Sequence, residues 1–142
     1  MADWYGHARS NYFRVKDQDA FADLCEKWNV TFIIDKDNPE LVGFICETDS
    51  GSLPNYRCEE HEDLEGNIQE FDYDFDDFLE KLSLHLEEGE IAIMIECGAE
   101  KLRYITGVAY AINSKGETVI VSLNDIYEKA KLLGNNITLA EY

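Results

Sequence analysis

Apolar residues recur along the chain at helical and strand spacings, and they predict alternating strands and helices. Residues 12–15 fit a short strand, and Asp17 follows as the N-cap of a helix that Asn29 ends. Residues 30–34 and 41–46 are rich in β-branched and aromatic side chains and flank a cluster of turn formers, which predicts a hairpin. The apolar positions of the helix recur at spacings of three and four, at Ala20, Phe21, Leu24, Cys25 and Trp28.

Residues 47–69 hold no sustained periodicity, and we predict a long surface loop there with one short strand near residues 55–58. Carboxylates and aromatic rings then alternate over residues 71–76, which predicts a strand with one aromatic and one charged face. A helix is expected over residues 76–88, ended by Gly89. Its apolar positions again recur at spacings of three and four, at Phe75, Phe78, Leu79, Leu82 and Leu86.

The uninterrupted apolar run at residues 91–95 predicts a strand covered on both faces. Residues 102–112 and 118–121 are predicted to continue the sheet. Residues 122–125 fit a capping box, and a last helix ended by Gly134 is expected after it. Its inward face is predicted from Ile126, Tyr127, Ala130 and Leu133.

Together these elements predict an α+β fold, with a mostly antiparallel sheet and about three helices packed on it. Residues 12–45 and 71–112 share the order strand, helix, strand, strand, so two similar βαββ halves are an open alternative to a simple meander. The 142 residues fit a single domain, residues 1–142, which can bury a core without metal or disulfide staples.

Negative charge dominates the composition, with 30 acidic residues against 12 basic ones and a net charge of −18. Residues 59–90 hold 14 of the acidic residues and one lysine, Lys81. An apolar fraction of 45% and an aromatic fraction of 12% fit a folded domain better than a disordered acidic tail. Solubility alone is the simplest alternative use for this charge.

The charge also bears on partners and location. It argues against binding nucleic acid or an anionic membrane, because both demand a cationic surface, and it favours a basic protein as partner. The chain shows no basic and apolar leader and no apolar run approaching the ~20 residues of a membrane helix. We therefore expect a cytoplasmic protein.

The acidic stretch predicts a structured anionic surface that binds this partner. It combines the strand at 71–76, the next helical turn and the preceding loop, with Tyr56 or Tyr73 as candidate anchors. Core packing is the favoured interpretation of the aromatic residues Phe71, Tyr73, Phe75 and Phe78. The predicted partner-binding residues are Glu59, Glu60, Glu62, Asp63, Glu65, Asp72, Asp74, Asp76, Asp77 and Glu80.

Groups that would carry catalysis or hold a metal are sparse. The sequence has no glycine-rich phosphate loop, Gly-x-Ser-x-Gly elbow or His-Glu-x-x-His motif, so we predict no enzyme activity, no catalytic residues and no cofactor. Its many carboxylates leave a glycosidase-like or metal-dependent site open on composition alone. Cys46, Cys58 and His61 supply three zinc ligands where a structural site needs four, so no metal site is predicted.

In its small size, its acidity and its folded apolar core, the chain resembles the inhibitors carried by phages and plasmids, namely anti-CRISPR proteins and anti-restriction DNA mimics. Residues 7–17, His-Ala-Arg-Ser-Asn-Tyr-Phe-Arg-Val-Lys-Asp, are also similar to accessory proteins of such mobile elements. The DNA-mimic class has no shared signature beyond acidity and small size, so the resemblance transfers no residue.

The resemblance implies that the target is a nucleic-acid-binding protein of a defence system, blocked by occlusion, with no direct contact to nucleic acid or membrane. An immunity protein that neutralises a nuclease toxin is the main alternative, because such proteins are also small and acidic. A small ligand-binding or catalytic domain is the third. A homodimer is left open.

Overall fold

A computed structural model describes residues 4–48, 51–100 and 104–140 of the chain. Its elements, in chain order, are β1 (Trp4–Ser10), α1 (Gln18–Lys27), β2 (Thr31–Ile34), β3 (Val42–Cys46), β4 (Tyr56–Glu62), β5 (Ile68–Asp74), α2 (Phe75–His85), β6 (Ile91–Glu100), β7 (Tyr104–Asn113), β8 (Thr118–Ser122) and α3 (Asp125–Ala130). None of the helices in these described ranges is both long and apolar enough to cross a membrane.

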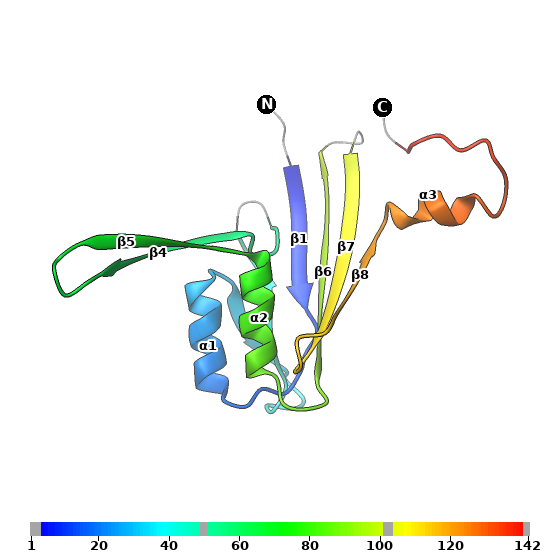
Figure 1. Cartoon of the computed structure of the whole chain (residues 1–142). Coiled ribbons are helices and arrows are strands. Elements are labelled where there is room, and N and C mark those ends of the chain that lie inside the picture. The colour runs from blue at the N-terminus through cyan, green and yellow to red at the C-terminus, as the bar shows by residue number, and fades with distance from the viewer. Residues whose placement is uncertain (1–3, 49–50, 101–103, 141–142) are drawn as a thin grey trace.

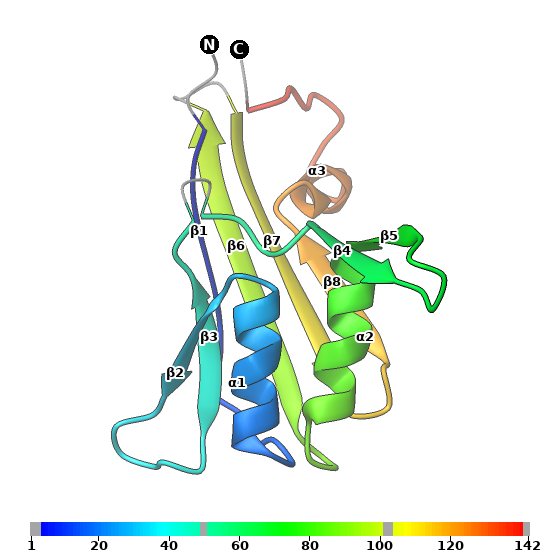
Figure 2. The ribbon, with the colours of Figure 1, turned by 90° about the vertical axis from the view of Figure 1, so that its left-hand side faces the viewer.

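Six antiparallel strands form a main sheet in the order β2-β3-β1-β6-β7-β8, and β4 and β5 form a separate hairpin. Helices α1 and α2 lie side by side on one face of the main sheet, and the hairpin projects outward beyond them (Figures 1 and 2). The predicted α+β fold is confirmed. The two βαββ units share their element order, but β1 joins the main sheet, whereas within the described residues β5 pairs with β4 in a separate hairpin.

The central strand β1 lies N-terminal to the strand that the sequence predicts at residues 12–15. Residues 12–15, predicted as a strand, make only isolated bridges, from Phe13 to Val42 and from Val15 to Leu86. The strand itself pairs along its whole length with β6 and in part with β3. Because β6 comes far later in the chain, no local signal marks β1.

Helix α1 and the β2–β3 hairpin confirm their predictions. The Asp17 carboxylate accepts hydrogen bonds from the backbone N–H groups of Asp19 and Ala20, which caps the helix. Asn29 follows the helix with a φ of +56°, a left-handed conformation that asparagine adopts more readily than most residues. Strands β2 and β3 then pair antiparallel.

Part of the segment predicted as a surface loop, residues 47–69, forms strands, namely residues 56–62 and 68–69. Strand β4 continues past the short strand predicted near residues 55–58 and pairs with β5 along its full length. The Asp63 carboxylate closes the turn between them, accepting hydrogen bonds from the backbone N–H groups of Glu65 and Asn67. The exposed hairpin is ordered by cross-strand pairing and lacks a buried apolar face, so hydrophobic periodicity does not reveal it.

The boundary between strand β5 and helix α2 differs slightly from the prediction, and one site residue changes element. Asp74 is the N-cap of α2 and forms a reciprocal capping box with Asp77. The Asp74 Oδ1 atom accepts from the Asp77 N–H at 3.1 Å, and the Asp77 Oδ2 atom accepts from the Asp74 N–H at 2.8 Å. Asp76, predicted on the charged face of the strand, therefore lies in the helix.

The core lies between helices α1 and α2 and the covered face of the main sheet. Phe78 of α2 is buried at its centre, and its ring meets that of Trp28 edge to face at 5.3 Å between centroids. The predicted core position of Phe78 is thus confirmed. Tyr73 and Phe75 pack against the core while half-buried, whereas Phe71 is exposed and lies outside it.

The other face of the main sheet is not covered by α1 or α2. Along β6, Ala92 and Met94 are buried beneath the helices, while Ile91, Ile93 and Ile95 alternate with them and are exposed. The prediction that this apolar run is covered on both faces is therefore wrong, because α1 and α2 lie on the same side of the sheet (Figure 2).

Helix α3 is shorter and less covered than predicted. It ends at Ala130, and no residue within it is buried, so the predicted inward face does not form. The capping interaction is present in part, since the Ser122 N–H donates to the Asp125 carboxylate at 2.8 Å. Leu133, predicted on the inward face, lies beyond the helix and is exposed.

Candidate functional site

The register of the β4–β5 hairpin divides its side chains between two faces, because residues directly opposite each other point the same way. The first, which we term the acidic face, consists of Tyr56, Cys58, Glu60, Glu62, Ile68, Glu70, Asp72 and Asp74. The second, the inner face, consists of Arg57, Glu59, His61, Gln69, Phe71 and Tyr73. The predicted separation of carboxylates from aromatic rings is therefore present in β5.

The acidic face carries five carboxylates and no basic side chain, and all its residues are exposed. Carboxylates two residues apart on one strand are ~6.8 Å apart, and residues directly opposite across the hairpin are ~5 Å apart at Cβ. Glu60 and Glu70 are such a directly opposite pair. Like charges in this position destabilise a hairpin, so a cation placed over them would relieve the repulsion.

The inner face joins the hairpin to helix α1 through Arg57. Its guanidinium lies between the rings of Trp28, at 5.8 Å, and Tyr73, at 5.5 Å. Its Nε donates to the Lys27 carbonyl at 3.0 Å, and its Nη2 pairs with the Glu59 carboxylate. Glu59, predicted to bind a partner, is thus already neutralised on the opposite side of the hairpin from the acidic face.

Other predicted residues serve the local fold. The hydrogen bonds that Asp63 accepts from the Asn67 and Glu65 backbone lower the pKa of its carboxyl. Asp77 is engaged in the capping box of α2. Asp76 and Glu80 are exposed on α2 and line a separate hollow between that helix and strands β7 and β8.

The ten predicted residues therefore do not form one surface. Four of them lie together on the acidic face, namely Glu60, Glu62, Asp72 and Asp74. Glu65 lies in the turn at the tip of the hairpin. Glu70, which completes the acidic face, was not predicted, although it shares the alternation of Asp72 and Asp74 once the strand is extended back to Ile68.

A side-chain hydrogen bond links the two strands on the acidic face. The Tyr56 hydroxyl donates to Asp72 Oδ1 at 3.0 Å. This bond, together with the charge of Asp72, raises the pKa of Tyr56 to about 12. Tyr56 is otherwise exposed, as expected for an anchor, whereas Tyr73, the other predicted anchor, is committed to Arg57 and Trp28.

The candidate zinc ligands do not converge. Cys58 and His61 are three residues apart in strand β4, so their side chains point to opposite faces of the hairpin. Cys46 is buried in strand β3 of the main sheet. Within the described ranges, no three histidine, cysteine or acidic side chains are grouped to hold a metal ion.

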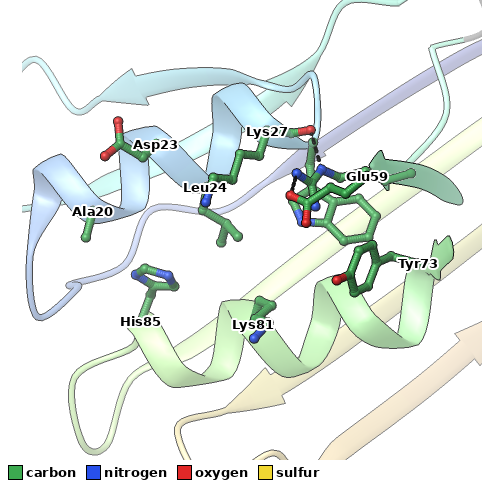
Figure 3. Close-up of a pocket in the computed structure, with 10 residues that line it drawn as sticks. Ala20, Asp23, Leu24, Lys27, Glu59, Tyr73, Lys81 and His85 are labelled. Atoms are coloured by element: carbon green, nitrogen blue, oxygen red, sulfur yellow. Dashed lines mark hydrogen bonds and ion pairs between the residues drawn. The ribbon is translucent and has the colours of Figure 1, made fainter. Parts of the chain in front are cut away.

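A groove of about 440 Å³ runs between helices α1 and α2 beneath the inner face (Figure 3). Its charges are mixed, because Lys27 and Lys81 share it with Asp23 and with the Arg57–Glu59 ion pair. It is lined by Ala20, Asp23, Leu24, Lys27, Trp28, Arg57, Glu59, Tyr73, Lys81 and His85.

His85 at the end of this groove supports a structural interpretation. Burial lowers the pKa of its imidazole, and its ring packs against Phe21 at 6.2 Å between centroids. No buried side-chain polar atom in the described structure lacks a hydrogen-bond partner, so none marks the groove as a ligand site. The acidic face, where five carboxylates converge without a basic side chain, is the stronger candidate.

No family model matches the chain, and comparisons with curated proteins and with solved structures give no significant match. The geometry and charge of the hairpin therefore carry the functional proposal.

Proposed function

We propose that the protein binds the nucleic-acid-binding surface of a basic protein through the acidic face and blocks that surface by occlusion. The observation that carries the proposal is the set of five carboxylates, without a basic side chain, on one exposed face of a projecting hairpin. A surface that binds nucleic acid presents Lys and Arg spaced to neutralise phosphates, and closely spaced carboxylates can occupy the same cations.

The way the hairpin is anchored to the helices supports this role. Arg57 fixes the base of the hairpin to α1, and the capping box fixes the start of α2. The carboxylates are therefore held on an ordered ribbon, which reduces the conformational entropy lost on binding. The net charge of −18 would also steer encounter with a cationic surface and speed association.

Exposed apolar residues beside the acids supply contacts that charge alone would not. Leu64 in the hairpin turn is fully exposed, and Tyr56 and Ile68 on the acidic face are exposed by 65% and 66%. Apolar and aromatic anchors surrounded by polar groups are typical of the energetically dominant part of an interface. We therefore include all three in the proposed contact.

The resemblance to anti-CRISPR and anti-restriction DNA mimics suggests the target class, a nucleic-acid-binding effector of a phage-defence system. The test is to co-express the chain with a panel of restriction and CRISPR systems and to measure the plating efficiency of phage. The chain should restore plating against its target system. Protection from a nuclease toxin, with every defence system unaffected, would instead favour an immunity protein.

A matched pair of variants assigns the effect to the acidic face. Glu60→Gln, Glu70→Gln and Asp72→Asn together should reduce the restored plating at least tenfold. The control combines Glu26→Gln, Asp37→Asn and Glu88→Gln, which remove the same charge from exposed positions elsewhere. Equal loss in both variants would mean that net charge, rather than this face, determines inhibition.

A further inference from the structure

The face of the main sheet opposite helices α1 and α2, which we term the open face, is an exposed apolar surface. The register places side chains of β1, β6, β7 and β8 in continuous rows across it, for example Arg9, Ile95, Ala109 and Val121. Its exposed aliphatic residues, each between 39% and 66% exposed, are Ile91, Ile93, Ile95, Ile105, Val119 and Val121. Contiguous apolar surface of this kind marks an interaction site.

The open face is also set apart by its charge. The acidic residues described in β1, β6, β7 and β8 are Glu96 and Glu100, which alternate with the exposed residues of β6 and lie on the covered side. Glu96 there accepts a hydrogen bond from the Leu53 N–H at 2.6 Å. His7 and Arg9 of β1 lie on the open face. In a chain of net charge −18, the described residues of β1, β6, β7 and β8 therefore bring no carboxylates to this face.

The shape of the open face suits an identical face. Strand β7 contributes small residues, Gly107, Ala109 and Ala111, between the larger side chains of β6 and β8. The Leu123 side chain lies over Gly107, so a shallow trough flanked by two aliphatic ridges remains along Ala109 and Ala111. Under a two-fold rotation, a ridge of one copy can enter the trough of the other, as a self-complementary interface requires.

The size of the face is adequate for a stable dimer. At ~3.3 Å per residue and ~4.8 Å between strands, β1, β6, β7 and β8 span roughly 500 Å² in projection. The side chains that stand on this plane raise the accessible area toward the ~800 Å² that each partner buries in a standard interface. Helix α3, on the same side of the sheet as the open face, adds exposed apolar surface at one end (Figure 1).

We propose that two copies of the chain associate through their open faces as a symmetric dimer, with the two sheets packed face to face. Helices α1 and α2 and the hairpin are on the other side of each sheet, so both acidic faces stay exposed in this dimer. The proposal rests on the apolar face alone and does not depend on the function proposed for the hairpin.

Sedimentation equilibrium of the full chain over a range of protein and salt concentrations tests this directly. A dimer is expected, and its dissociation constant should fall when salt is added, because salt screens the repulsion between two chains of −18. A monomer at every protein and salt concentration would overturn the proposal.

Two substitutions locate the interface. Ile93→Glu places a charge at the centre of the open face and should weaken the dimer at least tenfold. Leu84→Glu is the matched control, because Leu84 is an exposed aliphatic residue on α2, and it should leave the dimer unchanged. Unchanged dimerisation of a folded Ile93→Glu variant would contradict the proposal.

If Ile93→Glu does not fold, cysteine labelling of the unaltered chain tests whether the open face is the dimer interface. Cys97 lies on the open face and Cys58 on the hairpin, and both are exposed free thiols in a single copy. Maleimide labelling of Cys97 should slow at least fivefold as protein concentration passes through the dissociation constant, while labelling of Cys58 keeps its rate. A Cys97 rate that is independent of concentration while dimers form would place the interface elsewhere and overturn the proposal.

Discussion

Glu60 and Glu70 lie directly opposite each other across the middle of the β4–β5 hairpin, on a face that carries no basic side chain. This arrangement works against the stability of the hairpin, because like charges at opposed positions repel. It also concentrates negative potential where a cationic partner can reach it. The stability of the hairpin and the affinity for the partner should therefore respond in opposite directions to substitutions at this pair.

Glu70→Lys tests that opposition. It replaces the repulsion with an attractive cross-strand pair and should stabilise the hairpin by about 0.2–1 kcal/mol, as measured by hydrogen exchange of the β4 and β5 amides. Partner binding should fall at the same time. Glu26→Lys, an equal charge change on α1, should leave hydrogen exchange of the hairpin amides unaltered. A similar stabilisation of the hairpin by this control would show that relief of the Glu60–Glu70 repulsion is not the cause.

The Tyr56–Asp72 hydrogen bond makes a pH prediction. Because the folded chain holds the Tyr56 proton more tightly than the unfolded chain does, this contribution to stability is complete below pH 10 and is lost as the pH rises through the folded pKa of about 12. Asp72→Asn removes the charge and should move the pKa of Tyr56 down toward 10. NMR titration of ring-labelled tyrosine measures this pKa, and equal midpoints in the two proteins would refute the link.

Packing of helix α2 gives a stability prediction. Leu82 is fully buried, so Leu82→Ala should lower the free energy of unfolding by about 2–5 kcal/mol, from lost burial and the cavity left behind. Leu84 is 58% exposed on the same helix, and Leu84→Ala should change it by less than about 0.5 kcal/mol. Urea unfolding followed by circular dichroism gives both values, and similar costs at the two positions would show that the buried face is misassigned.

Asp77 in the capping box tests whether a carboxylate on α2 is structural or binds the partner. Asp77→Ala removes an acceptor from the start of α2 and should cost about 0.5–2 kcal/mol, again by urea unfolding, while partner binding stays unchanged. Asp76→Ala in the same turn should cost less, because Asp76 takes no part in the capping box. A loss of binding by the folded Asp77→Ala protein would extend the binding surface onto α2.

Local sequence signals are sufficient to predict helix α1 and the β2–β3 hairpin. Asp17 and the apolar spacing after it define helix α1, and the turn formers at residues 35–40 define the β2–β3 hairpin. Strand β1 could not be found in this way, because Ala8 and Ser10 are buried only when the distant strand β6 and the helices are in place.

The candidate site was predicted in part, for a related reason. The alternation that identifies Asp72 and Asp74 is visible in the sequence, but the extent of β5 depends on its pairing with β4. Without that register the prediction omits Glu70, and it places Glu59 in a partner-binding loop although Glu59 lies on the inner face of the hairpin. The apolar run in β6 likewise indicates two apolar faces correctly, yet it cannot indicate that the helices cover just one of them.

Competition for a purified target effector measures whether the acidic face binds the nucleic-acid-binding surface of that effector. Fluorescence anisotropy of a labelled duplex bound to that effector measures displacement by the chain, compared among wild type, the acidic-face variant (Glu60→Gln, Glu70→Gln, Asp72→Asn) and the control (Glu26→Gln, Asp37→Asn, Glu88→Gln). Wild type and control should displace the duplex equally, and the acidic-face variant should need at least tenfold more protein. Equal displacement by all three would contradict the assignment of binding to the acidic face.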